Sequence, residues 1–198
     1  MLDIFLIFRY ETTATLITFA LYNLARNQDL QEKLHKILQE SGEIDYNLTT
    51  SCTYLDAVIQ ETLRMYPPAA VMDREASEDY TLPGTEIVIP KGTDVQIPIV
   101  AIHMDPEFYP EPEMFDPERF MPENRDKLIP YTYLPFGAGP RNCIGMRFAL
   151  LEAKLLLARM ILSYRVSFTD KTIYPPKYVK AAGLLKFDPL LIRVETRS

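Results

Sequence analysis

The sequence predicts a mainly α-helical fold with small β hairpins, and three features of the chain support this prediction. Apolar residues recur at helical spacing in several segments, and the last of these, from about 144 to 163, is dense in Leu and Ala. Between about 69 and 100, short β-branched runs alternate with turns that contain Pro and Gly. With 198 residues, 47% of them hydrophobic, the chain can bury a core as one domain or as part of a larger one.

The composition excludes several other classes of protein. The formal net charge is −6 and no run of Lys or Arg is present, so we expect no binding to nucleic acid. The two cysteines, Cys52 and Cys143, lie far apart in the sequence, which argues against a disulfide scaffold and fits a reducing compartment. The first eight residues are apolar but short and are interrupted by Asp3, so they predict neither a signal peptide nor a membrane anchor.

Three helices are predicted before the β region. The first, from about 3 to 27, is apolar on nearly all sides and is expected to be buried. The second is amphipathic, can be capped by Asn27 or Asp29, and ends at Gly42, so it is expected on the surface. The third runs from about 51 to 65, where a pair of prolines stops it.

The middle of the chain changes from strands to an irregular segment. Three strands are predicted, at 80–82, 85–89 and 93–100. Their turns favour a small antiparallel hairpin. Eight of the sixteen prolines then fall within 106–140, which leaves little room for helix or sheet and is typical of a functional loop. After the Leu- and Ala-rich helix, the tail predicts a turn at Gly183 and a strand at about 190–194.

Cys143 ends a loop rich in Gly and Pro and immediately precedes the last long helix. Free backbone N–H groups and the positive end of the helix dipole favour an ionised thiolate there, which can bind a metal. The loop's glycines permit unusual backbone angles and the close approach of a flat cofactor. Arg141 can bind a cofactor carboxylate, and Phe136 can cover the sulfur from solvent. A small buried cysteine in a Gly-rich turn is the alternative interpretation.

This loop resembles the cysteine-loop motif of the cytochrome P450 family, F-x-x-G-x-R-x-C-x-G-x-x-x-A. The matching residues are Phe136, Gly139, Arg141, Cys143, Gly145 and Ala149. The resemblance implies the C-terminal, haem-binding portion of a cytochrome P450 fold over residues 1–198, with the N-terminal part absent. It also implies haem b as the cofactor, Cys143 as the metal ligand and the other matched residues as haem-binding residues. The sequence is most similar to animal microsomal enzymes of the group that includes thromboxane synthase and family three.

Glu61 and Arg64 are three residues apart on the predicted third helix and can pair. An exposed pair of this kind is common and contributes only about 0.2–0.5 kcal/mol. By resemblance, the two residues form the family's E-x-x-R element, which Arg119, in the segment Pro-Glu-Arg-Phe, joins in a buried network. We therefore expect these three residues to act in folding.

The resemblance also assigns residues to the haem, to proton delivery and to the substrate. Arg74 is expected on a haem propionate, and a solvated arginine among acidic neighbours is the alternative. Glu11 and Thr12 align with the acid–threonine pair that delivers protons for oxygen activation, whereas a mid-helix threonine most often bonds a carbonyl one turn earlier. The residues expected to face the substrate are Ala69, Ala70, Val71 and Leu184.

The implied activity is that of a haem-thiolate monooxygenase, which inserts one atom of dioxygen into an apolar organic substrate. The electrons would come from NADPH through a flavoprotein reductase, whose acidic surface could meet Arg141, Arg147 and Lys154. The resemblance places full-length relatives on the cytoplasmic face of the endoplasmic reticulum membrane, held there by an N-terminal part that this chain lacks.

Two residues depart from the family pattern and leave alternatives open. Phe8 and Arg9 stand where similar proteins have Ala-Gly before the acid–threonine pair. One alternative is a truncated, catalytically inactive haem-binding fragment. The other is a haem-thiolate isomerase that rearranges a peroxide substrate without a reductase.

The chain has two histidines, and neither has a second ligand at metal-binding spacing. His35 is expected on the surface of the second helix. His103 is expected in a loop after the hairpin, with a haem propionate as an alternative partner.

Overall fold

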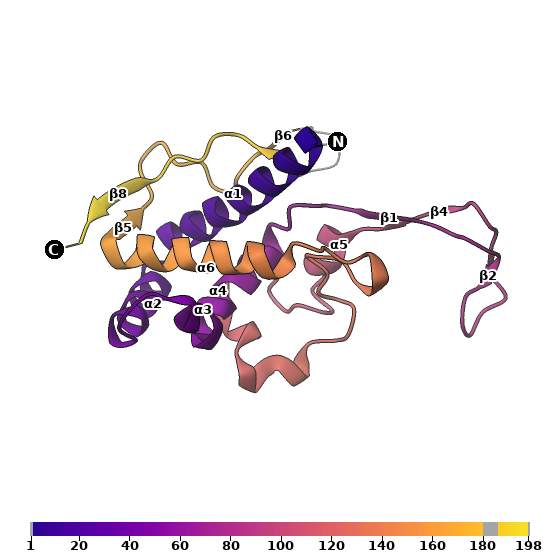
Figure 1. The fold of residues 1–198 in the computed structure, drawn as a ribbon, viewed down its shortest axis with the longest axis horizontal. Helices are drawn as coiled ribbons and strands as arrows, with labels where there is room; N and C mark the ends of the chain where they lie inside the picture. The colour runs from indigo at the N-terminus through magenta and orange to yellow at the C-terminus, as the bar shows by residue number, and fades with distance from the viewer. Residues whose placement is uncertain (1, 180–185, 198) are drawn as a thin grey trace.

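A helical body forms most of the molecule in the computed structural model, which describes residues 2–179 and 186–197. The two longest helices, α1 (Leu2–Arg26) and α6 (Met146–Ser163), pack against each other (Figure 1). Helices α2 (Gln28–Glu40) and α4 (Thr53–Met65) pack against both of them. Together with several two-stranded antiparallel pairs, this arrangement confirms the predicted mainly α-helical fold class. No helix in these described ranges is both long and apolar enough to cross a bilayer.

The core consists of apolar side chains that the four helices direct toward one another. Leu24 of α1, Leu34 of α2, Ile59 of α4 and Leu157 of α6 are fully buried in one cluster. Burying a side chain of this size contributes about 1.5–3 kcal/mol. Helix α2 buries one side only, in keeping with its amphipathic pattern. Asn27 precedes α2, but its side chain makes no capping hydrogen bond; its amide nitrogen donates instead to the carbonyl oxygen of Asn23 at 2.8 Å.

A short helix that the sequence analysis did not predict, α3 (Tyr46–Ser51), lies between α2 and α4. Its first turn is held by Asp45, whose carboxylate accepts from the backbone N–H of Leu48 at 2.9 Å. The predicted third helix therefore begins two residues later than expected, at Thr53.

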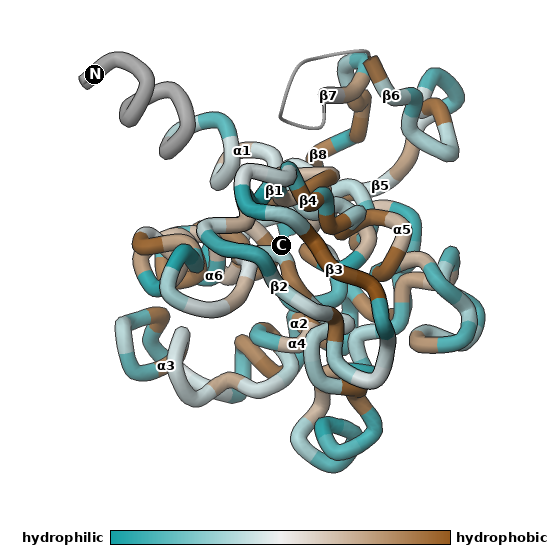
Figure 2. Tube along the Cα trace, turned by 90° about the vertical axis from the view of Figure 1, so that its right-hand side faces the viewer, coloured by the Kyte–Doolittle hydropathy of each residue, from teal (hydrophilic) through white to brown (hydrophobic). Residues whose placement is uncertain are grey.

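A β arm projects from the helical body (Figure 1). Strand β1 (Met72–Glu75) pairs with β4 (Asp94–Ile97), and β2 (Tyr80–Thr81) pairs with β3 (Val88–Ile89), all antiparallel. Figure 2, viewed from the side toward which the arm projects, shows hydrophobic residues at β3, where Val88 is exposed.

The prediction of one strand over 93–100 is wrong at its end. Pro98 has no N–H to donate to a strand ladder, so β4 stops before it. Helix α5 (Ile99–His103) begins immediately after Pro98. The proline-rich segment beyond α5 forms turns and three short 3₁₀ helices: η1 (Pro117–Phe120), η2 (Pro122–Lys127) and η3 (Gly139–Arg141).

The chain ends in two further strand pairs. Strand β5 (Tyr164–Ser167), directly after α6, pairs with β8 (Arg193–Thr196), so the predicted final strand lies about two residues later than expected. Strand β6 (Tyr178–Val179) pairs with β7 (Lys186–Phe187). The predicted turn at Gly183 lies outside the described residues.

The buried side chain of Gln31 joins α2 to β5. Its Oε1 accepts from the N–H of Val166 at 3.0 Å, and its Nε2 donates to the carbonyl oxygen of Val166 at 2.8 Å. The same amide donates to the carbonyl oxygen of Leu24 at 2.9 Å and accepts from Arg197 at 3.2 Å. All four hydrogen-bonding positions of the amide are therefore used.

Candidate functional site

The cysteine loop, residues 136–145, folds back on itself before α6. The backbone N–H of Cys143 donates to the carbonyl oxygen of Phe136 at 2.9 Å, and that of Asn142 donates to Gly139 at 3.1 Å. Gly139 has a φ of +75°, in the left-handed region that favours glycine. These bonds close the loop and hold Cys143 just before the first turn of α6.

The side chain of Cys143 is exposed, whereas Cys52 is buried in the core. Phe136 is half-buried and packs against the core while Cys143 is exposed, and the expected cover of Phe136 over the sulfur stays a prediction. Exposure also contradicts the alternative of a buried, inert cysteine. The first turn of α6 holds no acidic residue that would oppose an anion there, and the small residue Ala149 lies in this turn.

Strand β1 brings Arg74 next to the cysteine loop. A Cβ atom on Gly137 would lie 3.9 Å from Nη2 of Arg74 and only 3.0 Å from Sδ of Met72, and Gly137 itself has a φ of +72°. A glycine at this position is therefore what allows the strand and the loop to approach so closely. A second cation, Arg141, is exposed within the loop.

The residues present here fit a haem. The exposed thiol can supply a soft ligand to iron, the glycines leave space for a flat group, and two guanidinium groups can pair with its two carboxylates. Among the residues that the structure describes, no cluster of three or more His, Cys, Asp or Glu could hold a metal ion by itself. A single thiolate ligand to an iron already held by a porphyrin does not need such a cluster.

The other predicted site residues lie in three places. Ala69, Ala70 and Val71 form the connection between α4 and β1, and the carbonyl oxygen of Ala70 accepts from the N–H of Val100 at 3.2 Å. Glu11 and Thr12 are half-buried in α1. Leu184 lies outside the described residues, as do the side chains of Phe8 and Arg9.

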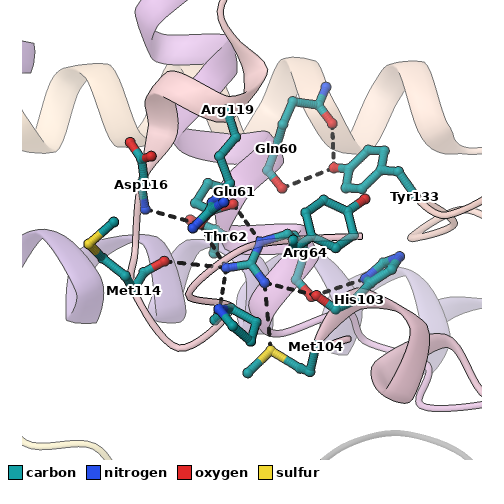
Figure 3. Close-up of polar contacts among 12 residues, drawn as sticks. Gln60, Glu61, Thr62, Arg64, His103, Met104, Met114, Asp116, Arg119 and Tyr133 are labelled. Atoms are coloured by element: carbon teal, nitrogen blue, oxygen red, sulfur yellow. Dashed lines mark hydrogen bonds and ion pairs between the residues drawn. The ribbon is translucent and has the colours of Figure 1, made fainter. Parts of the chain in front are cut away.

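Glu61, Arg64 and Arg119 meet in one buried network (Figure 3). The Nε and Nη2 atoms of Arg64 donate to the two carboxylate oxygens of Glu61 at 2.7 and 2.8 Å, and both side chains are 0% exposed. Oε1 of Glu61 also accepts from the backbone N–H of Asp116 at 3.0 Å and lies 3.6 Å from Nε of Arg119. Burial raises the pKa of Glu61, and the hydrogen bonds from Arg64 oppose that rise.

His103 occupies a position that the sequence analysis did not foresee. It is fully buried at the end of α5, not in a solvated loop, and both ring nitrogens bond to backbone groups, so it does not reach toward a propionate. Nε2 accepts from the N–H of Leu134 at 2.8 Å, so the ring proton lies on Nδ1, which donates to the carbonyl oxygen of Arg64 at 3.0 Å. Burial lowers the pKa of His103 to about 4 and keeps it neutral.

A thiol presented at the start of a helix by a glycine-rich loop, with arginines beside it, is the arrangement that a cysteine-ligated haem protein needs. The family model described as Cytochrome P450 matches residues 2–193. The chain is 44% identical to cytochrome P450 3A13 of Mus musculus over 98% of its own length. It is 45% identical to cytochrome P450 9e2 of Blattella germanica over 86% of its length, and to cytochrome P450 6a2 of Drosophila melanogaster over 88%.

The chain therefore belongs to the cytochrome P450 family, as the cysteine-loop motif indicates. It spans 39% of the mouse relative, 33% of the cockroach relative and 36% of the fly relative. Relatives named as family 3A recur among the matches, which agrees with the predicted likeness to family three.

Proposed function

We propose that residues 1–198 form the haem-binding part of a haem-thiolate monooxygenase. The observation that carries this proposal is the closed cysteine loop, which presents the exposed Cys143 at the start of α6 with Arg74 beside it. Haem b, when bound, supplies the oxygen-activating centre that inserts one atom of dioxygen into an apolar substrate. Residues of the cysteine loop and of β1 would then hold and position that group.

Cys143 would hold the haem iron through its sulfur, and the first turn of α6 carries no acidic residue that would oppose a bound thiolate. Arg141 and Arg74 would pair with the haem propionates. The small residues Gly139, Gly145 and Ala149 would leave room for the ring, and Phe136 would anchor the loop to the core.

Proton delivery is assigned to Glu11 and Thr12 of α1, by their alignment with the family's acid–threonine pair. Substrate contact is assigned to Ala69, Ala70 and Val71, and to Leu184. The connection that carries the first three leads into β1 and therefore toward the cysteine loop through Arg74.

An NADPH-dependent flavoprotein reductase is the proposed electron donor. Arg141 and Arg147 are exposed near the start of α6 and suit an acidic partner surface. Lys154 does not share this role, because its Nζ pairs with Asp56 at 2.6 Å and its side chain is only 12% exposed. By the resemblance to microsomal members of the family, we also propose a place on the cytoplasmic face of the endoplasmic reticulum membrane.

The test is the absorption spectrum of the chain after haem reconstitution, reduction and addition of carbon monoxide. A red-shifted Soret band is expected in the unmodified chain and should disappear in Cys143→Ser, because a hydroxyl is a poor replacement for the thiolate. Cys52→Ser is the matched control and should keep the band, since Cys52 lies in the core. Thr12→Ala should also keep it. A band that survives Cys143→Ser, or an unshifted band in the unmodified chain, would contradict the proposal.

A further inference from the structure

A continuous series of hydrogen bonds runs from the buried ion pair to the cysteine loop. Nε2 of His103 accepts from the N–H of Leu134, whose own carbonyl oxygen accepts from the N–H of Gly137 at 3.0 Å. Phe136, between them in sequence, accepts from the N–H of Cys143. The residue that fixes Leu134 therefore also fixes the backbone that closes the loop.

His103 and Arg64 hold each other through two hydrogen bonds, one donated by each residue. Nη1 of Arg64 donates to the carbonyl oxygen of His103 at 2.9 Å, while Nδ1 of His103 donates to the carbonyl oxygen of Arg64 (Figure 3). The ring of Tyr133 stacks on the imidazole with a centroid distance of 5.5 Å and an interplanar angle of 19°. The imidazole therefore cannot rotate without breaking buried contacts.

Only a neutral imidazole satisfies both ends of this arrangement. Nδ1 must donate to Arg64, and Nε2 must accept from Leu134, because a backbone N–H cannot accept. The two nitrogens therefore have separable functions. One ties the ring to α4, and the other ties the ring to the segment that enters the cysteine loop.

We infer that His103 is a positioning residue for Cys143, acting through the hydrogen bond from Leu134 that couples the Glu61–Arg64 pair to the cysteine loop. This inference rests on the proposed role of Cys143 as the haem ligand. It assigns to His103 no contact with the haem, the substrate or the reacting atoms. It explains why a histidine far from the loop in sequence is buried with both nitrogens bonded to backbone.

Two substitutions separate the two nitrogens. In His103→Asn the amide N–H lies near the place of Nδ1 and can still donate to Arg64, but the side chain is too short to reach Leu134. In His103→Gln the amide oxygen reaches the place of Nε2 and can still accept from Leu134. The readout is backbone amide exchange of the chain without haem, followed by NMR. We expect His103→Asn to speed exchange at Leu134 and Cys143 by roughly tenfold relative to His103→Gln.

Several results would overturn the inference. Equal acceleration at Cys143 in both variants would show that packing of the ring, not its acceptor nitrogen, is what matters. Acceleration at Leu134 with none at Cys143 would show that the hydrogen bonds do not reach the ligand. In the unmodified chain, mild denaturant should reveal one shared opening free energy for the two amides, and different values would also refute it. Failure of the haem spectrum in the unmodified chain would reject the proposed function and leave this result standing.

Discussion

Replacing Glu61 by Gln removes the carboxylate that pairs with the fully buried guanidinium group of Arg64. Glu61 accepts from Nε and Nη2 of Arg64 and from the N–H of Asp116 within 3.0 Å, and it lies 3.6 Å from Nε of Arg119. A glutamine has nearly the same shape, but one of its terminal groups is a donor that would face other donors. Arg64 would keep its charge without a counter-charge in the interior.

The expected cost follows from that stranded charge. Removing one partner of a buried ion pair costs about 3–5 kcal/mol. For a chain of this size, each kcal/mol lowers the melting temperature by about 2–4 °C, so Glu61→Gln should lower it by about 6–20 °C. The loss is a large part of the stability of an ordinary domain, about 5–15 kcal/mol.

The assay is urea and thermal unfolding followed by circular dichroism, with Glu40→Gln as the matched control. Glu40 lies 4.0 Å from Lys36 on the surface of α2, and its side chain is 67% exposed. Its substitution should change the unfolding free energy by less than about 0.5 kcal/mol. The reasoning would be refuted if Glu61→Gln cost no more than Glu40→Gln.

Three further predictions concern single residues. Burial lowers the pKa of His103 to about 4, so as the pH falls the unfolded state takes up a proton before the folded state does. The unfolding free energy, measured by urea titration, should therefore fall by about 2 kcal/mol from pH 7 to pH 5. A His103→Gln variant with the same pH dependence would show that His103 is not its origin. Tyr54 Oη is buried without a hydrogen-bond partner among the described residues. Tyr54→Phe should therefore raise the unfolding free energy by about 1 kcal/mol. A loss of stability would show that this hydroxyl does have a hydrogen-bond partner. Gly137 and Gly92 both have positive φ, but a Cβ would meet Met72 at Gly137 and nothing within 4 Å at Gly92. Gly137→Ala should therefore lower the melting temperature more than Gly92→Ala. Equal losses would show that the Met72 side chain can move away without cost.

The long helices were predictable because the sequence patterns that indicate them lie within each helix and at its ends. Helices α1, α2, α4 and α6 carry apolar residues at helical spacing, and prolines or glycines mark several of their ends. Helix α3 has only six residues and depends on the cap from Asp45, so no periodicity reveals it. Strand β1 is stabilised by its pairing with β4, about twenty residues later in the chain. The residues of β1 alone do not predict a strand.

The candidate site divides in the same way. The cysteine loop and the Glu61–Arg64 spacing are contiguous in sequence, so both could be identified from residue types alone. The role of His103 could not, because its partners, Arg64 and Leu134, come from segments that only the folded chain brings together. The exposed state of Cys143 likewise depends on how the cysteine loop folds back on itself before α6.

The amide of Gln31 has a consequence for how this chain meets other chains. Strand β5 pairs with β8 along one edge, and the N–H and carbonyl of Val166 on its other side are both taken by Gln31. A side chain thereby occupies the place of a third strand and blocks an open sheet edge, the kind of surface on which a foreign strand can add. Because that side chain belongs to α2, the backbone of Val166 becomes available to a foreign strand when α2 leaves the helical body.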